Sequence, residues 1–166
     1  MESKNLPHQR HLRKGRFSEE GRAYILTKCV SSGISLIENP SVAKALIEAL
    51  FWTERQNILF LGAFVVMPDH YHAVMVLAGN KSLSQIMRSI GSHTAREANR
   101  IAGSRGQIWQ RGYYDRAIRK TEDINSIFEY IHYNPVRQGL VQVADEWPYS
   151  SIAPAYHSRI RWHLFL

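Results

Sequence analysis

The fold of this chain is decided by residues 58–77, which read ILFLGAFVVMPDHYHAVMVL. From Ile58 to Met67 every residue is apolar or glycine, which is typical of a central strand buried on both faces. Pro68-Asp69 interrupts this strand, and a second β-prone stretch continues from His70 to Leu77. Because the interruption is so short, we expect the two strands to pair as a hairpin.

Regular hydrophobic periodicity continues on both sides of the hairpin. Before it we predict a strand over Tyr24–Val30 and a helix that starts at Asn39-Pro40 and runs to about Arg55. After it we predict a helix that is capped by Ser82 and runs to about Ile101, and a strand over Ile108–Ile118.

A last helix completes the pattern. We expect Thr121 to cap it and Glu122 and Asp123 to lie in its first turn, where they complement the helix dipole. Its buried stripe is Ile124, Ile127, Phe128 and Ile131. The first six elements match the ferredoxin-like split βαβ unit, an α+β fold with an antiparallel four-stranded sheet and two helices on one face. The last helix must then lie on the other face or at an edge.

Length, charge and cysteine content limit the class of protein. A chain of 166 residues with 45% hydrophobic and 21% charged residues is expected to form one compact domain. The net charge of +7 favours a polyanionic partner such as nucleic acid. Cys29 is the single cysteine, so an intramolecular disulfide and a cysteine-based zinc finger are excluded.

The ends of the chain differ from its middle. Residues 1–18 are basic and lack hydrophobic periodicity, so we expect an arm, followed by a domain over residues 19–141 and a tail over residues 142–166 that packs on it. No secretory signal follows the basic start, and the most apolar run is too short for a membrane helix. We therefore expect a cytoplasmic, nucleoid-associated protein with no membrane partner.

His70 and His72 are the sharpest local signal for chemistry. Side chains two apart on a strand share a face, so both imidazoles project together while Tyr71 points into the opposite layer. Two parallel imidazoles are a good start for a divalent metal site. The alternative is a pair of half-buried histidines that bind backbone groups.

The last helix supplies a second half of such a site. Tyr130 flanks its buried stripe, and Asn134 lies one turn further on the same side, whereas Tyr133 lies nearly opposite the stripe. A side-chain oxygen of Asn134 suits a hard ion such as Mg²⁺ or Mn²⁺. Alternatively, Tyr130 is a boundary tyrosine and Asn134 is a helix-end residue before Pro135, which we expect to end the helix.

Four motifs in order resemble the REP-associated tyrosine transposases, a group within the single-tyrosine HUH transposases of the IS200/IS605 type. The motifs are Met67-Pro68-Asp69-His70-Tyr71-His72, Trp109-Gln110-Arg111-Gly112-Tyr113-Tyr114-Asp115, Tyr130 to Val141 (YIHYNPVRQGLV) and Trp147-Pro148-Tyr149-Ser150-Ser151. The resemblance spans roughly Gly21 to Ser151. One departure is Arg116, where the family pattern leads us to expect histidine after the aspartate.

The resemblance implies a ferredoxin-like fold, a divalent metal and single-stranded DNA as substrate. Carried over by position, His70 and His72 match the metal histidines, Asn134 matches the polar third ligand and Tyr130 matches the nucleophile. Relatives of this group bind imperfect palindromes that fold as hairpins. They recognise a short tetranucleotide beside the hairpin and cut there through a 5′-phosphotyrosine, and the resemblance leaves open a monomer or a homodimer.

Basic residues supply candidate DNA contacts, because phosphate contacts set affinity and salt sensitivity. They are Arg10, Arg13, Lys14 and Arg16 of the arm, and Arg111, Arg119 and Lys120 beside the last strand. The other histidines, including His132, lack partners in the pattern and are expected to be surface or packing residues. The sequence leaves two alternative functions open. One is a module that binds palindromic DNA or structured RNA without cutting it, and the other is a small metallohydrolase that uses the histidine pair.

Overall fold

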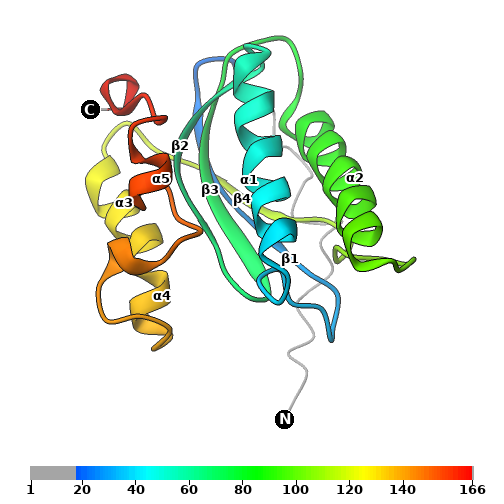
Figure 1. The fold of residues 1–166 in the computed structure, drawn as a ribbon. Coiled ribbons are helices and arrows are strands. Elements are labelled where there is room, and N and C mark those ends of the chain that lie inside the picture. The colour runs from blue at the N-terminus through cyan, green and yellow to red at the C-terminus, as the bar shows by residue number, and fades with distance from the viewer. Residues whose placement is uncertain (1–17, 166) are drawn as a thin grey trace.

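Four antiparallel strands form one sheet in the order β2-β3-β1-β4. The computed structural model describes residues 18–165 (Figure 1). Its main elements are β1 (Ala23–Cys29), α1 (Pro40–Arg55), β2 (Leu59–Val66), β3 (His70–Leu77), α2 (Leu83–Ala102), β4 (Tyr114–Ala117) and α3 (Ile124–His132). The short helices α4 (Asn134–Arg137) and α5 (Pro154–His157) follow, with 3-10 turns at Ala144–Glu146 and Trp162–Leu164. Element order and sheet order confirm the predicted ferredoxin-like α+β fold.

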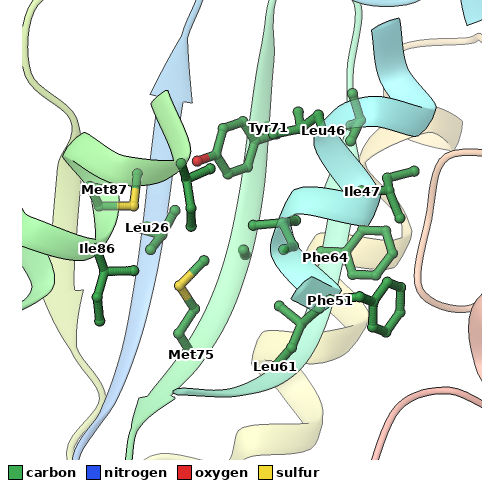
Figure 2. Close-up of a cluster of buried hydrophobic side chains, with 14 of the residues drawn as sticks. Leu26, Leu46, Ile47, Phe51, Leu61, Phe64, Tyr71, Met75, Ile86 and Met87 are labelled. Carbon is green, nitrogen blue, oxygen red and sulfur yellow. The ribbon is translucent and has the colours of Figure 1, made fainter. Parts of the chain in front are cut away.

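Each face of the sheet is covered by its own helices. α1 and α2 lie on one face and α3 lies on the other, as predicted (Figure 1). Leu26, Phe64 and Tyr71 of the sheet pack with Leu46 and Met87 of the two helices in the larger core (Figure 2). A smaller core on the other face joins strand residues to α3 and the tail; its buried members are Ala63, Val65, Met67, Val74, Ile127, Phe128, Ile131 and Trp147.

The predicted helix starts are confirmed for α1 and α2 and wrong for α3. The Asn39 side chain accepts from the Ser41 amide, and Ser82 forms a capping box with Gln85. At α3 the cap is Asp123, not Thr121, because the Asp123 carboxylate accepts from the Asn125 amide. Glu122 therefore lies before the helix rather than in its first turn.

The predicted strand over Ile108–Ile118 is shorter in the structure. Only Tyr114–Ala117 pairs with β1, while Trp109 forms an isolated bridge with Val30. Gly112 between them has a φ of 76°, a left-handed value that breaks strand geometry. The Lys28 ammonium donates to the carbonyls of Gln110 and Gly112, which holds this segment beside β1.

The prediction that Ile58–Met67 forms a central strand is wrong, because β2 is an edge strand. Its residues are nonetheless buried, since the tail covers the free edge. The Ser151 amide donates to the Phe64 carbonyl over 2.9 Å, and the Val66 amide donates to the Tyr149 carbonyl over 2.8 Å. The Trp147 indole also donates to the Val66 carbonyl. The tail thus protects an edge that would otherwise expose unpaired backbone groups.

His132 joins α3 to this covered edge. It is buried, so of the two expected roles, surface or packing, it has the packing role, because the tail covers this side of the helix. Its Nε2 lies 2.8 Å from the Ser151 hydroxyl, which also accepts from the Phe64 amide. Its ring lies against Phe128 and Trp162. These contacts fix the end of α3 that precedes Asn134.

No helix within residues 18–165 combines the length and the apolarity needed to cross a membrane.

The buried imidazole predicts a specific pH dependence of stability. Burial, with the charge of His157 adding to it, lowers the pKa of His132 to about 4. An unfolded histidine titrates near 6.5, so between about pH 6.5 and pH 4 the unfolded chain binds a proton that the folded chain excludes. The stabilisation by neutral His132, about 3 kcal/mol at most, is complete above pH 6.5 and is lost as the pH falls towards 4.

We expect His132→Gln to remove this dependence. Urea unfolding at pH 7.5 and pH 4.5 should show a smaller loss of unfolding free energy for the variant than for wild type, by roughly 2–3 kcal/mol. His93→Gln, at an exposed position on α2, should behave like wild type. Equal losses in wild type and His132→Gln would show that His132 is protonated in the folded protein at pH 4.5.

Candidate active site

β3 presents His70 and His72 on the sheet face that α3 covers. Tyr71, between them, is 1% exposed and packs edge-on against Trp109 in the α1–α2 core, as predicted. The strand lies between β2 and β1, so its backbone is held on both sides. The two imidazoles are therefore carried by a strand that is hydrogen-bonded to a neighbour on each side.

The two histidines face each other through the same ring atom. His70 Nε2 lies 3.1 Å from His72 Nε2, and the ring centroids are 4.6 Å apart. Each Nδ1 atom has a different protein partner. Asp69 Oδ1 lies 2.6 Å from His70 Nδ1, and Thr27 Oγ1 lies 2.7 Å from His72 Nδ1.

These partners orient both rings. An ionised carboxylate only accepts, so Asp69 places the His70 proton on Nδ1 and leaves a lone pair on Nε2. The Thr27 hydroxyl can accept from His72 Nδ1–H in the same way. In histidines that bind a metal through Nε2, a hydrogen-bond partner on Nδ1 is typical. Thr27 is opposite His72 in the β1–β3 register, 45 residues away in sequence, and the sequence gives no signal for it.

His72 is neutral near pH 7. Burial, together with the charges of His70 and Arg137, lowers the pKa of His72 to about 4. A neutral imidazole is the form that donates a lone pair to a metal ion.

The residues fit a divalent cation. Ligand bonds of about 2.1 Å that meet at about 90° place two donor atoms about 3.0 Å apart, close to the separation of the two Nε2 atoms. Asn134 is buried, and its Nδ2 has no hydrogen-bond partner among the described residues. Rotation of the amide group exchanges the positions of Nδ2 and Oδ1, so the Asn134 side chain can turn its oxygen towards a cation. Within residues 18–165 no three His, Cys, Asp or Glu side chains cluster, so a metal at the histidine pair would need a ligand of another kind beside the two imidazoles.

α3 brings Tyr130 to the histidines. Its ring centroid lies 6.1 Å from that of His72, and the side chain is 51% exposed. The helix ends at His132, and Pro135 falls in the first turn of α4 rather than ending the main helix directly. Proline is tolerated there because its missing amide would be unpaired anyway. Asn134 thus begins α4, and the turn between the two helices keeps it buried.

Arg137 is a residue that we assigned no role from the sequence. Its guanidinium carbon lies 4.3 Å from the centroid of the Tyr130 ring, and its Nη2 donates to the Tyr130 carbonyl. Because we expected Pro135 to end the helix, the return of the chain over Tyr130 could not be foreseen.

Arg116 lies near the same face, where the family pattern led us to expect histidine. It pairs with Ile25 across β4 and β1 and forms an ion pair of 2.6 Å with Glu122. Both residues line a cavity of about 470 Å³ that also borders Tyr130. A larger cavity of about 540 Å³ lies between α1 and α2, on the opposite face from the histidines.

Three of the seven predicted basic residues lie within the described part of the chain. Arg111, Arg119 and Lys120 are exposed in the segments on either side of β4. Arg10, Arg13, Lys14 and Arg16 lie outside the described residues.

Comparison with known proteins gives consistent matches. A family model described as "Transposase IS200 like" matches residues 22–134. A protein of Escherichia coli K12 named REP-associated tyrosine transposase is 31% identical over 107 residues, which cover 64% of this chain and 62% of that protein. A Haemophilus influenzae protein, provisionally given the same name, is 33% identical over 99 residues, covering 54% and 56%. The chain spans less than two thirds of the length of these curated relatives.

A solved structure gives broader coverage. It is described as a REP-associated tyrosine transposase bound to a REP hairpin, and it matches with a TM-score of 0.69 at 25% identity. The match covers 91% of this chain and 86% of that chain.

The orientation of His72 by Thr27 leads to a testable expectation. Thr27→Val keeps the shape of the side chain and removes the hydroxyl, so we expect the Kd for Mn²⁺ to rise about 10- to 100-fold. Calorimetric titration of the full chain measures this. Thr121→Val, at an exposed position before α3, is the matched control and should bind like wild type. An unchanged Kd in Thr27→Val would refute the orienting role, and wild type that binds no Mn²⁺ would refute the metal site.

Proposed function

Because the chain belongs to the family of IS200-like transposases, we propose that it cuts and rejoins single-stranded DNA that folds into hairpins. Tyr130 is the nucleophile, and His70, His72 and Asn134 hold a divalent cation, Mg²⁺ or Mn²⁺. The observation that carries this proposal is the pair of Nε2 atoms 3.1 Å apart beside an exposed tyrosine.

The reaction requires a phosphoryl transfer to a phenol oxygen. Tyr130 Oη attacks the phosphorus of a phosphodiester, the new O–P bond forms and the bond from phosphorus to the 3′ oxygen breaks. The phenol proton is lost, and the segment on the 5′ side of the cut leaves with a 3′ hydroxyl. The segment on the 3′ side stays attached to Tyr130 through its 5′ phosphate. The reverse attack by a 3′ hydroxyl rejoins the strand, because the covalent link conserves the energy of the phosphodiester.

The remaining residues support this chemistry. A divalent cation, when bound, makes phosphorus more electrophilic and stabilises the charge of the transition state. Asp69 and Thr27 hold the two imidazoles in the lone-pair orientation that such an ion needs. Exposure of Tyr130 leaves its hydroxyl open to a DNA strand that crosses this face of the sheet.

The choice of substrate is supported by the relatives. The structural relative is described in complex with a REP hairpin, and two curated relatives carry the REP-associated name. We propose that this chain likewise takes a hairpin with a short recognition sequence beside it. The net charge of +7 suits a polyanion, with Arg111, Arg119 and Lys120 as phosphate contacts.

A covalent adduct tests the proposal. A single-stranded hairpin with four randomised positions beside its stem is mixed with the full chain and Mn²⁺, then run on a denaturing gel. A 3′ label should move to the protein band, and a 5′ label should leave on a shorter free strand. Tyr130→Phe should abolish the adduct. Tyr133→Phe is the matched control, since Tyr133 lies three residues away and is similarly exposed, at 47% against 51%, and it should form the adduct.

Two results would contradict the proposal in different ways. An adduct that persists in Tyr130→Phe would assign the nucleophile to another residue. A hairpin whose mobility shifts on a native gel without any adduct in Mn²⁺ would favour a module that binds such DNA and does not cut it.

A further inference from the structure

A positively charged side chain lies directly on the candidate nucleophile. Pro135 opens α4, and this turn brings Arg137 back over Tyr130, seven residues earlier in the chain. The guanidinium carbon is 4.3 Å from the ring centroid, and Nη2 donates to the Tyr130 carbonyl. Two contacts to one residue fix the position of the charge relative to the tyrosine.

The charge of Arg137 is not neutralised by the described part of the protein. Several arginines are paired with a carboxylate within 4 Å, namely Arg22, Arg55, Arg100, Arg116, Arg159 and Arg161. Arg137 forms no ion pair within residues 18–165, and its side chain is exposed. A guanidinium has five N–H donors, so donors remain for a ligand beyond the Tyr130 carbonyl.

The same charge also acts on the histidine pair. Arg137 is close enough to His72 to influence that imidazole electrostatically, and the His72 ring contacts the Tyr130 ring edge-on. The guanidinium, the tyrosine and the histidines therefore surround one small region of the surface.

We propose that Arg137 binds the phosphate that Tyr130 attacks, which makes it a catalytic residue of this site. The proposal rests on the proposed function. A guanidinium matches the planar arrangement of two phosphate oxygens and binds them through parallel N–H···O bonds. A fixed cation at the reacting phosphate stabilises the negative charge that grows on its oxygens in the transition state.

A purely structural arginine would give different results. It would cap the Tyr130 carbonyl and support the ring, so its loss would displace Tyr130 without changing how many phosphates the protein neutralises. The salt dependence of DNA binding separates the two roles. Each phosphate contact to single-stranded DNA contributes about 0.7 to the slope of log K against log salt.

The experiment uses the full chain with Arg137→Gln, Arg137→Lys and a control, Arg88→Gln. Arg88 is exposed on α2, on the opposite face of the sheet, and the control makes the same change in charge. Binding of the hairpin pool is measured in EDTA across a range of salt concentrations. The rate of adduct formation is measured separately in Mn²⁺.

We expect Arg137→Gln to lower the salt slope by about 0.7 and the adduct rate by about 10²- to 10³-fold. Arg137→Lys keeps the charge and loses the planar fork, so it should keep the slope and lower the rate by less. Arg88→Gln should leave both unchanged. An unchanged slope in Arg137→Gln, an equal fall in Arg88→Gln, or a lowered slope with a wild-type adduct rate would each overturn the proposal. Wild type that forms no adduct would overturn the proposed function instead, and the slope would still decide the phosphate contact.

Discussion

The site depends on two imidazoles whose Nδ1 atoms are both hydrogen-bonded, to Asp69 and to Thr27. Both rings are thereby turned so that their Nε2 atoms lie 3.1 Å apart. Two lone pairs at that distance repel each other unless a proton or a cation lies between them. Successive side chains of β3 point to opposite faces of the sheet, which creates this arrangement. Tyr71 points into the larger core, and His70 and His72 on either side of it point to the site face. Moving the strand register by one residue would bury both histidines and expose Tyr71.

A second constraint is the position of α3 over the histidines. The helix packs on the sheet through Ile127, Phe128 and Ile131, and His132 ties its end to Ser151 of the tail. The tail in turn closes the free edge of β2. The residues that stabilise the sheet edge therefore also set where Tyr130 lies, which links folding of the tail to the geometry of the site.

Local patterns were sufficient to predict β3, the histidine pair and the packed stripe of α3, because these depend only on the periods of a strand and a helix. Longer-range features were not predictable. The edge position of β2 depends on the order of the strands. The covering of that edge and the burial of His132 depend on a tail more than 80 and about 20 residues away, respectively. The Thr27–His72 contact depends on strand register. At the start of α3, Asp123 caps the helix in place of Thr121, and Glu122 forms an ion pair with Arg116 of β4. Both Thr121 and Asp123 are residues that can cap a helix, so the local sequence alone does not decide between them.

The most direct test of the proposed metal site is a crystal of the full chain grown with Mn²⁺ and measured for anomalous scattering. The proposed metal site predicts an anomalous peak bonded to His70 Nε2 and His72 Nε2, with the Asn134 side chain as a third protein ligand and Tyr130 beside it. A peak bound only elsewhere on the protein, with the two Nε2 atoms still in contact with each other, would contradict it.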